Sequence, residues 1–147
     1  MNPQPLHDGP TALHLNDTCI FLARDGTVRS YAKTAETLRK SGSDPELTDG
    51  RMLAMFHVSS PRDVHYPTWE MHPDGDELLI LASGSLSVEV RDGKTICSAR
   101  LPSQAAFVVP AAQWHRLIVH EPSVLIAITP RRNTVHQNWE DDVRAAD

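Results

Sequence analysis

The sequence contains no apolar run long enough to cross a membrane. None of its hydrophobic segments approaches the roughly 18 consecutive apolar residues that a transmembrane helix needs. The opening stretch, MNPQPLHDGP, includes neither a basic n-region nor an apolar h-region, so we expect no secretory signal. These absences favour a cytoplasmic protein that does not contact a membrane.

Cysteine and positive charge are also scarce. The 2 cysteines, Cys19 and Cys97, are too few for a disulfide framework, and we expect both to be buried, reduced thiols. With 14 Lys and Arg against 19 Asp and Glu, the net charge of −5 argues against nucleic acid as a partner, because phosphate binding needs a basic footprint. The sequence has no Gly-rich phosphate loop, no Ser-His-Asp order and no CxxC pair, so nucleotide, acyl-transfer and thiol-redox chemistry lack support.

The length of 147 residues fits one domain with a core and a pocket. We expect a Pro-rich, flexible N-terminal arm at residues 1–12, a β-barrel domain at 13–130 and a polar C-terminal tail at 131–147. The tail is expected to wrap the surface or a partner subunit. A homodimer that forms through a sheet edge and this tail is expected, because exposed edges need covering.

The pattern along the chain predicts strands and turns with little helix. Residues 18–32 are expected to form a hairpin around the Asp25-Gly26 turn, and residues 34–42 a short helix that Thr34 caps. Residues 43–50 are expected to be loop. Beyond them, short apolar runs follow one another at intervals of about eight to twelve residues, as in an antiparallel sandwich or barrel. The fold is therefore predicted to be all-β.

The stretch WEMHPDGDE places two carboxylates and an imidazole directly before an apolar run. In an extended strand, Glu70 and His72 face the same side. Together with Glu77 and His115, they could be ordinary surface residues at strand ends. Alternatively, two carboxylates held close inside a barrel require a cation between them, because their repulsion and desolvation are costly. Imidazole and carboxylate together suit zinc, iron, manganese or nickel.

The spacing of these residues resembles the first sequence motif of the cupin superfamily. That motif usually reads His-x-His, three or four residues, Glu, six residues, Gly. Here the chain reads Glu70-x-His72, four residues, Glu77, six residues, Gly84. The PDGDE loop contains turn-forming residues that let the chain reverse, so that Glu77 points back towards the same ion as His72.

A second stretch resembles the second cupin motif, which typically has Pro-x-Gly, two residues, His. The sequence PAAQWH supplies Pro110, Ala112 in the place of the glycine, and His115. The resemblance extends over roughly residues 50–130. It implies a cupin-like double-stranded β-helix, or jelly-roll barrel, with a short N-terminal helix and one mononuclear divalent metal ion in the lumen.

By this resemblance, His72, Glu77 and His115 match three of the superfamily's four usual metal ligands, and Glu70 takes the place of the fourth. As a ligand, Glu70 would complete a set of two imidazoles and two carboxylates that neutralises a divalent ion. Freed from the metal, it would leave a 2-His-1-carboxylate set, as in non-haem Fe(II) oxygenases, and could be the catalytic general base. The third alternative is that Glu70 does neither.

We expect a small pocket with apolar walls above the metal. Met55 and His57 share one strand face and are candidates to line it, and so are Phe107 and Leu117. For His57 and Phe107, core packing is the commoner role of such residues in an apolar strand, and His65 could cover the mouth of the pocket. Four other histidines look incidental: His7, His14, His120 and His136.

The resemblance favours a metal-dependent enzyme that acts on a small organic molecule, with oxygenase or isomerase/lyase chemistry. A non-catalytic cupin that binds a small ligand or the metal, in a regulatory role, is the second hypothesis. The third is an interaction protein that uses the barrel only as a scaffold. Zinc, iron, manganese and nickel all suit the expected ligands.

Overall fold

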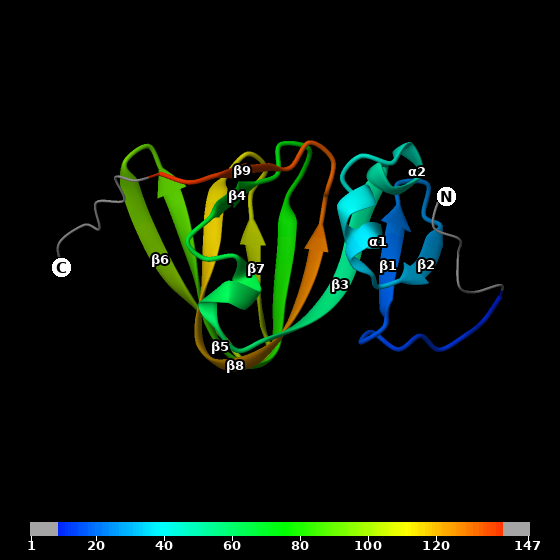
Figure 1. Cartoon of the computed structure of the whole chain (residues 1–147), viewed down its shortest axis with the longest axis horizontal. Helices are drawn as coiled ribbons and strands as arrows, with labels where there is room; N and C mark the ends of the chain where they lie inside the picture. Colours follow the sequence, from blue (N-terminus) through cyan, green and yellow to red (C-terminus); the bar gives the residue numbers. More distant parts are fainter. Residues whose placement is uncertain (1–8, 140–147) are drawn as a thin grey trace.

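The computed structural model describes residues 9–139, and Figure 1 shows a barrel beside a smaller N-terminal lobe. Its elements, in chain order, are β1 (Thr18–Ala23), β2 (Val28–Ala32), α1 (Ala35–Lys40), α2 (Pro45–Thr48), β3 (Gly50–Val58), the 3-10 helix η1 (Pro61–Val64), β4 (Trp69–Met71), β5 (Glu77–Asp92), β6 (Thr95–Pro102), β7 (Ala105–Val109), β8 (Trp114–Thr129) and β9 (Val135–Gln137). Within the described residues, no helix is long and apolar enough to cross a membrane.

Two long strands, β5 and β8, hold the barrel together. Each has 16 residues, and they pair antiparallel along most of their length. On its other edge β8 pairs with β3 and β4, while β5 pairs with β7 and then β6. Because β5 and β8 pair with each other and each also pairs with two further strands, the two long strands connect the others around one common core. This topology confirms the predicted all-β jelly-roll fold.

A bulge explains why β5 is one strand, although its turn residues predicted two. The register between β5 and β8 shifts between Leu81 and Leu86. Within this bulge Gly84 has a φ of +99°, and a side chain there would collide with the Ser123 side chain and the Pro122 backbone. Gly84, the glycine of the first motif, therefore lets β5 bend and continue as one strand. Likewise, β8 joins two runs that the sequence predicted as separate strands.

The N-terminal lobe contains the predicted hairpin and helix. β1 pairs antiparallel with β2, and Thr34 Oγ1 caps α1 by accepting a hydrogen bond from the Thr37 backbone at 3.1 Å. The loop predicted at residues 43–50 is wrong, because this segment contains α2. Asp44 caps this helix through the Glu46 N–H at 2.9 Å, directly before a proline, which favours a helix start.

The buried apolar residues of the described part of the chain form two hydrophobic clusters, and Phe56 on β3 packs against both of them. The barrel cluster is formed by Val58, Leu79, Leu81, Leu86, Val88, Leu101, Val109 and Leu125. The N-terminal cluster includes Cys19, which is fully buried as predicted. Cys97 is exposed on β6, so the prediction that both thiols are buried is wrong for this residue.

The chain returns to the barrel after residue 130. Strand β9 pairs antiparallel with β4, with Glu70 opposite His136, and Figure 1 shows the two strands side by side. Within the stretch that the sequence assigned to a tail, residues 135–137 therefore continue the sheet. Of the predicted arm, only residues 9–12 lie within the described part of the chain, and residues 140–147 of the tail lie outside it.

Candidate metal centre

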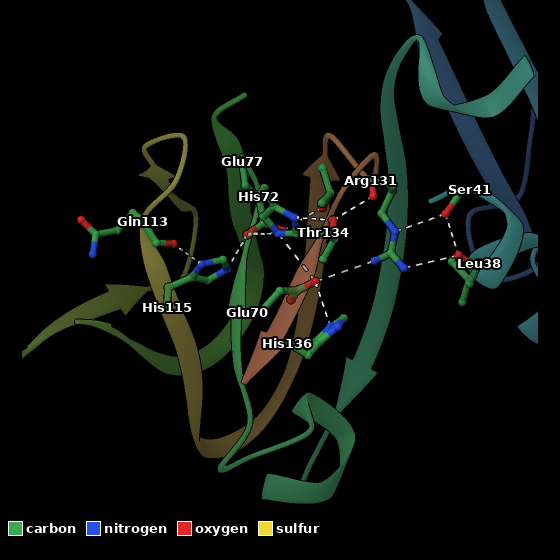
Figure 2. Close-up of polar contacts among 11 residues, drawn as sticks. Leu38, Ser41, Glu70, His72, Glu77, Gln113, His115, Arg131, Thr134 and His136 are labelled. Carbon is green, nitrogen blue, oxygen red and sulfur yellow. Dashed lines mark hydrogen bonds and ion pairs between the residues drawn. The ribbon is translucent and has the colours of Figure 1, made fainter. Parts of the chain in front are cut away.

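The four residues expected at the metal come from three segments and meet at one end of the barrel (Figure 2). Glu70 on β4 lies directly opposite His115 on β8, so both side chains project from the same face. His72 follows the end of β4, and Glu77 is the first residue of β5. The turn between His72 and Glu77 is fixed by a hydrogen bond to the second motif. The Ala111 backbone N–H donates to Asp76 Oδ1 at 2.8 Å.

The ligand atoms of these residues converge. Glu77 Oε2 lies 2.8 Å from His115 Nε2 and 3.6 Å from His72 Nε2, and His72 Nε2 lies 3.7 Å from Glu70 Oε1. The ligand atoms of Glu70, His72 and His115 all lie within 4.8 Å of one another. A tetrahedral zinc ion separates its nitrogen and oxygen ligands by about 3.3–3.6 Å. The cluster therefore has room for one divalent ion once His115 and Glu77 move slightly apart.

Hydrogen bonds orient both imidazoles with Nε2 towards the centre. His72 Nδ1 lies 2.9 Å from Thr134 Oγ1, and that hydroxyl donates its only hydrogen to Arg131 O at 2.8 Å. The hydroxyl must accept from His72 Nδ1–H, so the neutral ring has its lone pair on Nε2. His115 Nδ1 lies 3.2 Å from Gln113 O, which can only accept, so the same tautomer follows.

Two buried polar atoms at the centre have no hydrogen-bond partner among the described residues. They are His72 Nε2 and Glu77 Oε2. The other carboxylate oxygen of Glu77 accepts a hydrogen bond from Thr129 Oγ1 at 2.7 Å, which turns Oε2 towards the imidazoles. Buried polar groups without partners are costly, and two imidazole lone pairs facing a carboxylate repel it. A divalent cation satisfies all of these atoms at once, so the residues present fit a metal ion.

The electrostatics of the metal-free cluster show the same complementarity. Burial acts to raise the pKa of Glu77, but the contacts with His115 and His72 outweigh it and hold the pKa well below its usual range. Burial acts to lower the pKa of His115, but the Glu77 carboxylate outweighs it and raises the pKa. Without a metal, positive charge on His115 therefore stabilises the Glu77 carboxylate.

Glu70 has a different environment from Glu77. Its side chain is 29% exposed against 6% for Glu77, and it lies at the edge of the cluster. Its Oε1 lies 3.5 Å from His136 Nε2 and 4.0 Å from Arg131 Nη1. Burial opposes ionisation of Glu70, but the contact with His136 and the nearby His72 and His115 together outweigh it, so the pKa is lowered. The same contact raises the pKa of His136.

Several residues around the cluster were missed from the sequence. His136 looked incidental, yet it contacts Glu70 from β9. Strand β9 has only 3 residues, too few for an alternating pattern to reveal its direction. Thr129 and Thr134 orient Glu77 and His72, but a threonine in a strand or turn gives no sequence signal of this role.

A cavity of about 480 Å³ adjoins the cluster. Glu70, Glu77 and His115 form its polar end, and apolar side chains from β3, β5 and β8 form its walls. Leu117 and His65 both line the cavity.

Three of the predicted pocket residues do not line this cavity. On β3 the inward positions are Met52, Ala54, Phe56 and Val58, so Met55 and His57 point the opposite way. His57 Nε2 instead lies 2.9 Å from Asn16 Oδ1. The sequence grouped Met55 with His57 correctly but could not tell which face of the strand is the lumen. Phe107 packs against the barrel cluster, as its alternative reading had it.

Comparison with known proteins gives likeness of fold only. No protein-family model matches the chain, and no curated protein matches its sequence. A cupin-2 domain containing protein from Shewanella frigidimarina is 23% identical with a TM-score of 0.44, and the match covers 55% of this chain and 71% of that one. Fe(II)-HppE with the alternative substrate (S)-1-HPP is 18% identical with a TM-score of 0.48, and the match covers 84% of this chain and 62% of that one. Oxalate decarboxylase of Bacillus subtilis, which has Mn(II) centers, is 19% identical with a TM-score of 0.45, and the match covers 58% of this chain and 23% of that one.

This chain therefore spans less than two thirds of the length of HppE and of oxalate decarboxylase. All three TM-scores lie below 0.5, so these likenesses do not bear on activity. The strand topology, the bulge at the motif glycine and the convergence of both motifs at one end of the barrel are the features that confirm the cupin-like jelly-roll fold.

Proposed function

We propose that this protein is a metal-dependent enzyme that acts on a small organic molecule, with one divalent ion held by His72, His115, Glu77 and Glu70. The observation that supports this most strongly is the buried His72 Nε2, which has no hydrogen-bond partner among the described residues and lies 3.6 Å from Glu77 Oε2, next to a cavity of about 480 Å³. Cavities of this size are typical of small-molecule sites. Zinc, iron, manganese and nickel suit the ligand set.

When bound, the metal supplies Lewis-acid polarisation of a substrate oxygen, or redox chemistry if it is iron or manganese. The chain's own residues supply the environment. The apolar walls exclude water, and Thr134 and Thr129 hold the ligands in place. Glu70, at the cavity edge beside His136, is either the fourth ligand or a base that accepts a proton from the substrate. Oxygenase or isomerase/lyase chemistry suits this arrangement.

A non-catalytic metal- or ligand-binding protein is the second candidate. It is favoured by the presence of two carboxylates, Glu70 and Glu77, which together neutralise a divalent ion. A neutral site is a poorer Lewis acid than one with a net positive charge. Turnover of a small organic substrate by metal-loaded protein, found by screening, distinguishes the enzyme from this candidate.

Elemental analysis of protein purified without added metal tests the site itself. We expect one divalent ion per chain, and His72→Ala and His115→Ala should each lower metal affinity by more than 100-fold. His120→Ala is a matched control, because this exposed imidazole bonds to Ser87 away from the cluster. Protein that stays metal-free in every preparation, with a Tm unchanged by zinc, iron, manganese or nickel, contradicts the proposal.

We also propose that the protein is a cytoplasmic homodimer. Strand β6 pairs only with β5 among the described strands, which leaves one edge for another chain. The two described cysteines are free thiols, as in a reducing compartment. Sedimentation equilibrium tests the dimer, and a monomeric mass at micromolar concentration contradicts it.

A further inference from the structure

Two of the charged groups that face the cavity already have partners. Arg116 lines it, but its Nε lies 2.6 Å from Glu89 Oε2 in a buried ion pair. Asp63 lines it too, and its Oδ2 accepts hydrogen bonds from the backbones of Ser59 and Ser60 at 2.9 and 3.1 Å. The ion pair therefore neutralises Arg116, whereas Asp63 keeps its negative charge with Oδ2 occupied by these hydrogen bonds.

At the metal end the charge of the cavity depends on the ion. Glu70 and Glu77 contribute two negative charges and Arg131 one positive charge, when the histidines are counted as neutral. With a divalent ion bound, His72 and His115 are neutral ligands, so this end has a net charge of one positive unit, and the compensating charge has to come from a ligand.

Arg131 is held in a fixed orientation at this end. Its Nε donates to Ser41 Oγ at 3.2 Å and its Nη2 donates to Leu38 O at 3.3 Å, which ties it to α1 (Figure 2). Its Nη1 lies 4.0 Å from Glu70 Oε1, beyond hydrogen-bond distance. The guanidinium thus keeps N–H donors available on the side of the metal cluster. A guanidinium edge matches the geometry of a carboxylate.

Apart from Asp63, His65, Thr68 and Arg116, the remainder of the cavity is apolar. Its walls include Met52, Phe56, Leu79, Leu117 and Leu125. A hydrocarbon body placed against these side chains is stabilised by burial, whereas a second charged group would be desolvated without a partner. The cavity is therefore suited to a ligand with one polar end.

We propose that the metal-loaded cavity binds a small monoanionic carboxylate with an apolar body. The carboxylate lies between the metal cluster and Arg131 Nη1, and the hydrocarbon part lies against the apolar walls. This inference rests on the proposed metal site. It goes further by naming the class of ligand and by assigning its selection to Arg131.

Calorimetric titration of zinc-loaded protein with four probes tests the ligand class. Hexanoate is expected to bind at least tenfold more tightly than hexanol or hexylamine, which have the same chain but no negative charge. It is also expected to bind at least tenfold more tightly than acetate, which lacks the apolar body. Hexanoate that binds zinc-loaded protein no more tightly than hexanol, or no more tightly than acetate, overturns the inference.

Variants of two adjacent arginines test the role of Arg131. Arg131→Gln should weaken hexanoate binding at least tenfold and leave hexanol unaffected, whereas Arg131→Lys should keep part of the preference. Arg132→Gln is the control, because Arg132 is 58% exposed and pairs with Asp74 at 3.3 Å outside the cavity. Equal hexanoate affinities in Arg131→Gln and Arg132→Gln overturn the assignment to Arg131.

Zinc content is measured first in every sample, so that the two proposals fail separately. Wild-type protein that takes up no zinc contradicts the metal site itself. Protein that holds one zinc ion and binds the probes without regard to charge contradicts only the ligand class. If Arg131→Gln does not fold, Arg131→Lys decides, because the loss of the fork geometry alone should still weaken hexanoate binding several-fold.

Discussion

His72 and Thr134 are 62 residues apart in the sequence, and His72 Nδ1 lies 2.9 Å from Thr134 Oγ1. The hydroxyl is itself fixed, because it donates to Arg131 O at 2.8 Å. The contact therefore selects the imidazole tautomer that turns a lone pair towards the metal cluster. Residues that hydrogen-bond to a metal ligand commonly affect the affinity for the metal, because they orient that ligand.

Replacement of Thr134 by Val should lower zinc affinity by about 10- to 100-fold, because the imidazole loses its orienting acceptor. Thr134→Ser keeps the hydroxyl and should retain most of the affinity. Thr95→Val, at an exposed position on β6, is the matched control. Competition titration with a chromogenic chelator measures all three affinities. Thr134→Val and Thr95→Val with the same affinity would show that this contact does not orient a ligand.

The two carboxylates are predicted to contribute unequally to metal binding. Glu77 lies within 3.6 Å of both imidazoles and is 6% exposed, whereas Glu70 is 29% exposed and also contacts His136. Glu77→Gln should therefore cost more zinc affinity than Glu70→Gln, and each should cost more than tenfold. The exposed Glu121→Gln is the control.

The Glu70→Gln variant also decides between the two roles left open for this residue. Unchanged zinc affinity contradicts Glu70 as a ligand. If such a variant has also lost a turnover that the wild type shows, Glu70 acts as the general base. A turnover that survives together with the metal contradicts both roles.

Much of the barrel could be predicted from the sequence because the information is local. Alternation and turn residues place the strands, and the spacing of Glu70, His72, Glu77 and His115 brings their segments together. The sequence could not show which face of each strand points into the barrel. Met55 and His57 alternate as expected, yet they face away from the cavity, because only the packing of β3 against β8 defines the inside.

The outer contacts of the site could not be predicted, for a related reason. His136 and Thr134 lie in a polar segment, and nothing local indicates that this segment pairs with a strand more than 60 residues earlier. Arg131 lies next to Arg132 in the same polar segment, yet it connects α1 to the metal cluster. Such roles arise from long-range pairing, which a single sequence does not record.

Ala112 takes the place of the second-motif glycine, and it adopts a left-handed backbone with a φ of +63°. This conformation costs a residue with a Cβ roughly 1 kcal/mol, which glycine avoids. Ala112→Gly should therefore stabilise the protein by up to about 1 kcal/mol, despite the entropy that glycine loses on folding. Ala111→Gly, one residue earlier, should destabilise it slightly instead. Urea unfolding of the three proteins measures the difference, and destabilisation by both variants contradicts the strain at Ala112.

Cys19 and Cys97 are predicted to differ in reactivity. Cys19 is fully buried, whereas Cys97 is exposed on β6. At pH 8, iodoacetamide should modify Cys97 in the folded protein, and Cys19 only after denaturation. Mass spectrometry of the cysteine peptides measures both rates, with Cys97→Ser as the control that should remain unmodified. Equal rates at the two thiols in folded protein would be inconsistent with the burial of Cys19.

The same thiol should give a pH dependence of stability. Burial raises the pKa of Cys19 from its ordinary 9.0 to about 11, against the opposing charges of Lys33 and Arg131. Between these values the folded protein keeps a proton that the unfolded chain releases, so the thiol's contribution to stability is complete below pH 9 and is lost as the pH rises through about 11. The stability difference between wild type and Cys19→Ala should therefore shift against the wild type from pH 8.5 to pH 10.5. Urea unfolding at both pH values measures this shift, and because Cys19→Ala lacks the thiol, the titration of lysines and tyrosines cancels in the comparison. A difference that stays constant with pH contradicts the raised pKa, since the thiol would then ionise equally in the folded and unfolded chains.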